Sequence, residues 1–410
     1  MPTARGRFVQ RLLVCVCAIG LWVCAPVAGA AGPGTGIDPD TQFTPLAAST
    51  LTTPAAVLGS DGRRHIAYEL ELTNASGLSA TVTRVEVRAP GVKRPLAELS
   101  GEALVAAMTR PGGLPPGTPD AEATVLAPSS VAIVWLDVTL PRRQRVPRSL
   151  EHHVSATLAA PTPVQFSGSL GEVRMARRAP VRLGPPLRDG IWVADEGCCS
   201  APTHHRRGLA PVNGTLGVPQ RFAIDWAMLD DQHRAWVGDP GQLTSYVGYG
   251  QPEIAAAPGV VVSAVDGIKD NAPQGTLEDL PAMDETVGNH VILRIAPRRF
   301  LLYGHMKRGS VRVKVGQRVR AGQLLGQVGN SGNSSTPHLH FQVLTQPTFF
   351  PSDSVPYTFR RFTMLGQAEP FTDEDLALRS SGTIEVTATR PSPRRDELPL
   401  DLSVIRFGGR

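Results

Sequence analysis

Short runs in which apolar and polar residues alternate, separated by turns, recur along most of this chain. Residues 66–73 read Ile-Ala-Tyr-Glu-Leu-Glu-Leu-Thr, and residues 131–140 and 154–158 are similar. An apolar residue at every second position is the pattern of a strand with one buried face. Gly and Pro supply 41 and 37 of the 410 residues, and both favour turns over long helices. The chain is therefore predicted to be all-β.

Breaks in this pattern divide the chain into two β domains. Residues 45–181 hold short strands between Pro-rich turns, which indicates an N-terminal immunoglobulin-like β-sandwich. A Pro/Gly linker follows, and a C-terminal antiparallel β domain is predicted for residues 189–367. Residues 368–410 are predicted to be a polar tail, whose earlier part could add a strand and whose residues 391–395 are expected to be flexible.

The N-terminus has the pattern of an export signal. A basic start precedes an apolar run at residues 12–23, which is too short for a comfortable membrane span. Small residues at 28–30 suit cleavage, so residues 1–30 are predicted to be a signal peptide of an exported protein, periplasmic or extracellular. A lipid anchor on Cys24 and a retained anchor helix are the alternatives. No later segment has the apolar length of a transmembrane span.

The charge of the chain gives no sign of a nucleic-acid partner. The formal net charge is +5, but the predicted signal carries three arginines and no acid, so the remainder is about +2 (5 − 3). No run of Lys and Arg with interleaved aromatic residues is present. Nucleic-acid binding is therefore not expected.

Two adjacent cysteines, Cys198 and Cys199, are the only ones outside the N-terminal segment. A ring closed between neighbouring residues is strained, so a structural staple is not expected here. A vicinal disulfide, two buried thiols and a metal cluster with the nearby His204 and His205 remain open.

Residues 329–343 are the most informative stretch for function. A run of Gly, Asn and Ser, which is typical of a loop, leads into His338-Leu339-His340-Phe341, which reads as a strand. Side chains two apart on a strand share a face, so His338 and His340 point to one spot. Two converging imidazoles suit a metal and a metal-bound water. By themselves they could also be solvated histidines at a sheet edge.

A catalytic zinc site needs three protein ligands and an open position, so further candidates are required. Asp225 lies in an apolar strand, where a lone carboxylate is costly unless it binds a metal or pairs with a base such as Arg221. His204 and His205 form a pair in an upstream loop, which could equally be solvated surface. His305 follows the end of a strand and could instead cap a turn.

Three stretches together resemble the lysostaphin-type (LytM-like) zinc metallopeptidase family. They are Leu302-Tyr303-Gly304-His305-Met306, residues 316–323 and residues 329–343. The likeness spans roughly residues 204–343 and does not extend to the sandwich or the tail. It implies a duplicated hybrid motif fold with a zinc groove, and an exported zinc metalloendopeptidase that hydrolyses peptide bonds in bacterial peptidoglycan peptides.

The resemblance also implies the Zn²⁺ ligands. The family's aspartate and the second histidine of its His-x-His pair fall on Asp225 and His340. The usual first ligand lies four residues before the aspartate, where this chain has Arg221, and arginine cannot bind zinc. Some relatives resemble this chain in placing a histidine in an upstream loop before Arg-Arg. On that likeness His205 is predicted to be the third ligand, with His204 as the alternative.

The remaining predicted site residues follow from the same resemblance. His305 and His338 would act on the attacking water and on the developing oxyanion. Asn330, Asn333 and Ser335 are predicted to line the groove and bind the substrate backbone, although turn formation is the alternative for each. A non-catalytic LytM-like binding or activator protein of the cell envelope is the main alternative function. A carrier domain of lipoyl or sugar-permease type fits less well, because no lysine stands at an obvious hairpin tip.

Overall fold

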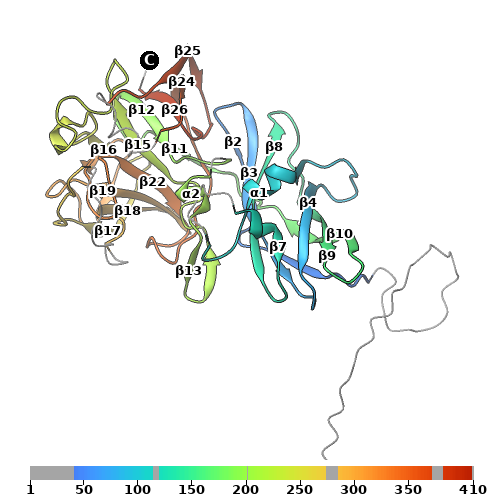
Figure 1. The fold of residues 1–410 in the computed structure, drawn as a ribbon. Coiled ribbons are helices and arrows are strands. Elements are labelled where there is room, and N and C mark those ends of the chain that lie inside the picture. The colour runs from blue at the N-terminus through green and yellow to red at the C-terminus, as the bar shows by residue number, and fades with distance from the viewer. Residues whose placement is uncertain (1–40, 114–119, 201, 274–284, 372–381, 409–410) are drawn as a thin grey trace, which may run out of the picture. The chain divides into compact units, whose positions relative to one another are not determined.

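The computed structural model describes residues 41–113, 120–200, 202–273, 285–371 and 382–408. Strands dominate these residues, and the helical elements are short (Figure 1), so the prediction of an all-β chain is confirmed. The helical elements are the α-helices α1 (Gly101–Ala106) and α2 (His204–Arg207) and the 3-10 helices η1 (Ala121–Thr124) and η2 (Leu243–Ser245). The predicted signal peptide lies outside the described residues. Among the described residues, no helix has the length and apolar character needed to cross a membrane.

The N-terminal part consists of two five-stranded antiparallel sheets that enclose one apolar core. One sheet contains β1 (Leu46–Thr50), β2 (Ala56–Leu58), β3 (Arg63–Asn74), β6 (Met108–Thr109) and β8 (Val131–Pro141). The other contains β4 (Ala80–Arg88), β5 (Ala97–Ser100), β7 (Val125–Leu126), β9 (Ser149–Leu158) and β10 (Val164–Arg174). The immunoglobulin type of this sandwich and the predicted domain limits stay predictions.

Strand β3 differs from its predicted form. Tyr68 and Leu70 face the sandwich core, as the alternation indicates. The opposite face is also covered, because Ala67 belongs to the apolar core of the C-terminal part and Glu69 is fully buried. The expectation of a half-buried strand is therefore wrong, since the second face of β3 packs against residues distant in the sequence.

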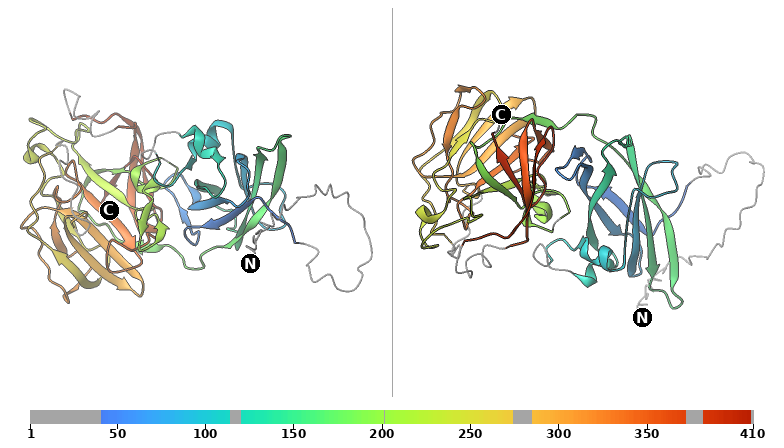
Figure 2. Two further views of the ribbon diagram at one scale, coloured as in Figure 1. Left: turned by 60° about the horizontal axis from the view of Figure 1, so that its bottom comes forward. Right: turned by 90° about the horizontal axis from the view of Figure 1, so that it is seen from above.

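The C-terminal part is built on an antiparallel sheet in the order β20-β17-β18-β19-β22-β15-β12-β26-β24-β25. Figures 1 and 2 show this strand-rich part of the chain in yellow-green to red. Its strands are β12 (Gly190–Asp195), β15 (Ile224–Leu229), β17 (Gly259–Val265), β18 (Asn289–Ala296), β19 (Arg299–Met306), β20 (Arg318–Val319), β22 (Leu339–Leu344), β24 (Phe362–Ala368), β25 (Val386–Arg394) and β26 (Ser403–Phe407). Two-stranded sheets are formed by β11 (Val181–Leu183) with β23 (Tyr357–Phe359), β13 (Ala210–Val212) with β14 (Thr215–Gly217), and β16 (Pro252–Ile254) with β21 (Leu324–Gln327).

The predicted polar tail contributes two strands to this sheet. β26 lies between β12 and β24, with Val404, Ile405 and Phe407 buried. The expected flexibility of residues 391–395 is wrong, because residues 391–394 belong to β25. β25 is the last strand in the order of this sheet, and an edge strand tolerates proline because one side of it needs no backbone N–H.

Glu253 in β16 is a buried acid without a compensating partner. It is fully buried, and neither carboxylate oxygen has a hydrogen-bond partner among the described residues. Burial raises the pKa of Glu253 well above its usual value, so the folded chain favours the protonated form. Below the pKa that Glu253 has in the unfolded chain, its contribution to the free energy of unfolding is at its maximum. As pH rises from this pKa to the pKa of Glu253 in the folded chain, the contribution decreases by ~1.4 kcal/mol for each pH unit.

Replacement of Glu253 by Gln should therefore stabilise the protein increasingly with pH. The variant keeps the shape of the side chain but has no charged form to bury, so its free energy of unfolding should exceed that of the parent more at about pH 8 than at about pH 5. Urea unfolding across this range measures the difference. The matched control is Glu102→Gln, since Glu102 is exposed in α1 and should give the same difference at both pH values. Parallel pH curves for Glu253→Gln and the parent would contradict the prediction.

Candidate metal centre

Three neighbouring strands bring most of the predicted site residues together. In the antiparallel register, Asp225 of β15 lies opposite His340 of β22, and His340 lies opposite Gly304 of β19. His305 follows Gly304 directly and has a φ of 59°, a left-handed conformation that non-glycine residues adopt rarely. The sheet itself therefore places an acid and two histidines side by side.

His205, Asp225 and His340 form a compact group of metal-ligating side chains. Each offers one ligand atom, and these atoms lie within 4.8 Å of one another. His340 Nδ1 is 2.8 Å from Asp225 Oδ1, and His205 Nε2 is 3.4 Å from Asp225 Oδ2. All three side chains are buried. Two imidazoles and one carboxylate are a ligand set of catalytic zinc sites, so the residues fit zinc.

Hydrogen bonds set which nitrogen of each histidine faces this group. His205 Nδ1 donates to the backbone oxygen of Glu196 at 3.2 Å, which leaves Nε2 with a lone pair. His340 Nε2 is 2.8 Å from Gln342 Oε1, and Gln342 Nε2 donates to the oxygen of Pro219 at 2.8 Å. Gln342 must then accept at Oε1, so His340 Nε2 donates and Nδ1 is available to a metal. Such outer partners orient metal ligands and raise their basicity.

Sequence reasoning missed Gln342, although a signal for it was present. The alternation that placed His338 and His340 on one face of a strand also places Gln342 on that face, two residues further on. The salt bridge considered between Asp225 and Arg221 is not formed, because Arg221 pairs with Glu69 and Asp353 instead.

The short helix α2 turns the two adjacent histidines in different directions. Thr203 caps the helix, with its Oγ1 accepting from the backbone N–H of Arg206 at 3.2 Å. His205 points inward to Asp225, whereas the side chain of His204 is 53% exposed and pairs with Glu196. The geometry favours His205 over His204 as a metal ligand.

His305 and His338 stand beside the ligand group. His305 Nδ1 donates to the oxygen of Ser331 at 2.7 Å, and His338 Nδ1 donates to the oxygen of Thr336 at 2.7 Å. The centres of the two rings are 4.9 Å apart, and His338 Nε2 is 3.3 Å from Asp225 Oδ2. Burial, followed by neighbouring histidines, lowers the pKa of His305 well below its usual value. Each Nε2 therefore remains for a water or a substrate.

A pocket of about 620 Å³ opens over these residues. Asn333 and Ser335 line it, whereas Asn330 does not. Asn330 is fully buried, where its side chain accepts from Ser334 Oγ at 2.6 Å and donates to a neighbouring loop. Its predicted contact with substrate is therefore corrected to a role in shaping the loop. Phe371 and Leu402 from the C-terminal segment also line the pocket, which sequence reasoning did not foresee.

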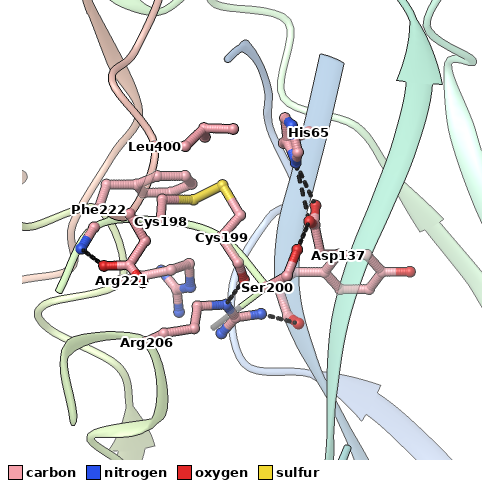
Figure 3. The surroundings of a disulfide bond; sticks show 12 residues. His65, Asp137, Cys198, Cys199, Ser200, Arg206, Arg221, Phe222 and Leu400 are labelled. Atoms are coloured by element: carbon pink, nitrogen blue, oxygen red, sulfur yellow. Dashed lines mark hydrogen bonds and ion pairs between the residues drawn. A yellow bond between two sulfur atoms is a disulfide. The ribbon is translucent and has the colours of Figure 1, made fainter. Parts of the chain in front are cut away.

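Cys198 and Cys199 form a vicinal disulfide, one of the alternatives left open by the sequence. Both residues are buried, and Cys199 lies beside His65 and Asp137 (Figure 3). A metal group of these cysteines with His204 and His205 is not found among the described residues.

Comparison with known proteins supports the family resemblance over part of the chain. Residues 244–350, which include His305, His338 and His340, match the family model described as peptidase family M23. The segment that carries these three histidines is therefore similar to M23 peptidases. The predicted resemblance to lysostaphin-type peptidases is thereby confirmed. Asp225 and His205 precede the matched residues, so their assignment rests on the geometry above.

Individual curated relatives match short segments of this chain. The cell division protein DipM of Caulobacter vibrioides is 36% identical over 92 residues, which are 20% of this chain and 15% of that protein. The glycyl-glycine endopeptidase ALE-1 of Staphylococcus capitis is 51% identical over 41 residues, 10% of this chain and 11% of that protein. The chain thus spans a small part of the length of these curated relatives.

Among solved structures, the catalytic domain of lysostaphin from Staphylococcus simulans is similar to part of this chain. Its sequence identity is 19%, and the match covers 41% of this chain and 88% of that chain with a TM-score of 0.22.

Proposed function

We propose that this protein is an exported zinc metalloendopeptidase that hydrolyses peptide bonds in bacterial peptidoglycan peptides. The observation that carries the proposal is the convergence of His205, Asp225 and His340 beside two further histidines at one pocket. The match to peptidase family M23 and the likeness to an endopeptidase support it. A non-catalytic activator would be expected to lack a ligand, and the apparent loss at Arg221 is offset by His205.

The residues of the site have different roles in peptide hydrolysis. His205, Asp225 and His340 would hold zinc, which when bound supplies a water with a pKa of about 7 and polarises the scissile carbonyl. His338 Nε2 accepts the proton of the attacking water and passes it to the leaving amine nitrogen. Asp225, at 3.3 Å, stabilises the imidazolium that His338 becomes.

His305 is better suited to orient the water than to stabilise the oxyanion. Its lowered pKa keeps the ring neutral, and its one proton lies on Nδ1 towards the oxygen of Ser331. Nε2 then carries a lone pair and accepts a hydrogen bond from the water. Donation to a developing oxyanion would require a second proton on His305, which burial opposes.

Digestion of isolated peptidoglycan by the purified protein tests the proposal. Incubation with zinc should release fragments with new amino and carboxyl ends inside the peptide portion, which mass spectrometry identifies. Prior removal of metal with a chelator should stop the release, and added zinc should restore it. A protein that binds zinc but releases no peptide fragments would favour the activator function.

A further inference from the structure

Glu69 is a charged side chain at the contact between the sandwich and the metal centre. It lies on the face of β3 opposite the sandwich core and is fully buried. Arg206 Nη1 donates to Glu69 Oε1 at 2.6 Å, and Arg221 Nη2 donates to Glu69 Oε2 at 2.6 Å. Both arginines are also fully buried. Charges at this depth persist only when they are paired, and removal of one partner leaves the others uncompensated.

The charges of Glu69 and of the side chains around it balance. Arg221 Nε also contacts Glu69, which makes a two-pronged ion pair, and Arg221 Nη1 is 2.6 Å from Asp353 Oδ1. Two guanidinium groups therefore meet two carboxylates. Burial alone would raise the pKa of Glu69, but Arg221 and Arg206 outweigh it and lower that pKa, so Glu69 is ionised.

Arg206 connects Glu69 to the relocated metal ligand. It follows His205 directly in α2, a single helical turn that is too short to be stable by itself. Its Nη2 donates to the backbone oxygens of Tyr68 and Leu136, at 3.0 and 2.9 Å. Its Nε donates to the oxygen of Cys199 at 3.0 Å (Figure 3). The direction of His205 thus depends on contacts that Arg206 makes with the sandwich.

Arg221 connects Glu69 to the second ligand segment. It stands four residues before Asp225, the position where the family resemblance would place a histidine ligand. The next residue, Phe222, donates its backbone N–H to Ser354 Oγ at 3.2 Å and packs in the core beneath β15. Arg221 therefore fixes the segment that enters the strand of Asp225, although it cannot bind the metal itself.

We propose that Glu69 is a positioning residue of the metal centre, which acts through Arg206 on His205 and through Arg221 on Asp225. The inference rests on the proposed zinc function. It extends the support of the metal site into the sandwich, one contact beyond the direct partners of the ligands, since Glu69 comes from β3. Removal of a direct partner of a metal ligand typically lowers metal affinity by about 10–100-fold, which sets the scale for Glu69.

The test is the zinc affinity of the full chain with Glu69→Gln, measured by competition with a chromophoric chelator on protein shown to be folded by circular dichroism. The affinity should fall by about 10–100-fold. The matched control is Glu86→Gln, because Glu86 is also a buried acid of the sandwich and pairs with Arg88 and Arg84. This control should keep the parent affinity. Parent affinity in folded Glu69→Gln would overturn the inference.

Two milder variants keep the test informative if Glu69→Gln does not fold. Arg206→Lys keeps the charge, but its single nitrogen cannot replace the separate donors to Glu69, Cys199, Tyr68 and Leu136, so zinc binding should weaken. Glu69→Asp keeps the charge at a shorter reach, and its affinity should lie between those of the parent and Arg206→Lys. Parent affinity in both variants would overturn the inference while leaving the zinc function intact. A parent protein that binds no zinc would overturn the proposed function, and this inference with it.

Discussion

Replacement of His340 by alanine should abolish zinc binding and reduce hydrolysis of peptidoglycan peptides by about 10³-fold or more. The change removes Nδ1, which lies 2.8 Å from Asp225 Oδ1, and leaves two of the three proposed ligands. A metal contributes several kcal/mol to the transition state of a hydrolysis, and each ~1.4 kcal/mol is a factor of ten in rate. Elemental analysis of the purified variant and the initial rate of fragment release measure the two effects.

A second buried histidine of the same sheet serves as the matched control. His290 in β18 is 8% exposed and bonds to the oxygen of Gly288 at 2.8 Å and to Ser263 Oγ at 2.9 Å. It does not belong to the ligand group, so His290→Ala should lower stability but keep zinc. If His340→Ala retained one zinc per chain and the parent rate, the proposed metal centre would be wrong.

Features encoded by local sequence could be predicted. The alternation that runs from His338 into β22 placed His338 and His340 on one face, and an apolar strand made Asp225 conspicuous as a buried carboxylate. The positions of these residues next to one another follow from strand pairing, in which Asp225 lies opposite His340. Local periodicity specifies which side of a strand a residue occupies, and the family resemblance supplied the grouping of Asp225 with His340 as proposed ligands.

Features set by distant contacts could not be predicted from the residues alone. The choice between His204 and His205 depends on Arg206, whose carboxylate partner Glu69 is 137 residues away in the sequence. The same contact buries the face of β3 that its alternation marked as exposed. The wall of the pocket formed by Phe371 and Leu402 likewise requires the C-terminal segment to join the sheet beside β12.

Replacement of His338 by alanine should have a different outcome from His340→Ala, although the two residues are neighbours on one strand face. We expect the variant to keep its zinc but to lose about 10²–10⁴-fold in kcat, the usual contribution of a group that transfers protons. His338 is outside the ligand group, and its Nε2 has no hydrogen-bond partner among the described residues. Its Nδ1 is held by the oxygen of Thr336, so the ring is oriented without a metal.

The decisive experiment on His338 measures the zinc content and the rate of peptide hydrolysis in the same preparation of each variant. His338→Gln is the informative companion, because glutamine can still hold a water by hydrogen bonds but cannot carry its proton to the leaving nitrogen. Both variants should bind zinc as tightly as the parent, with the glutamine variant as slow as the alanine variant within about tenfold. Loss of zinc in step with loss of rate would instead make His338 a ligand. The His-x-His pair would then act as two equal metal ligands, with proton transfer left to His305.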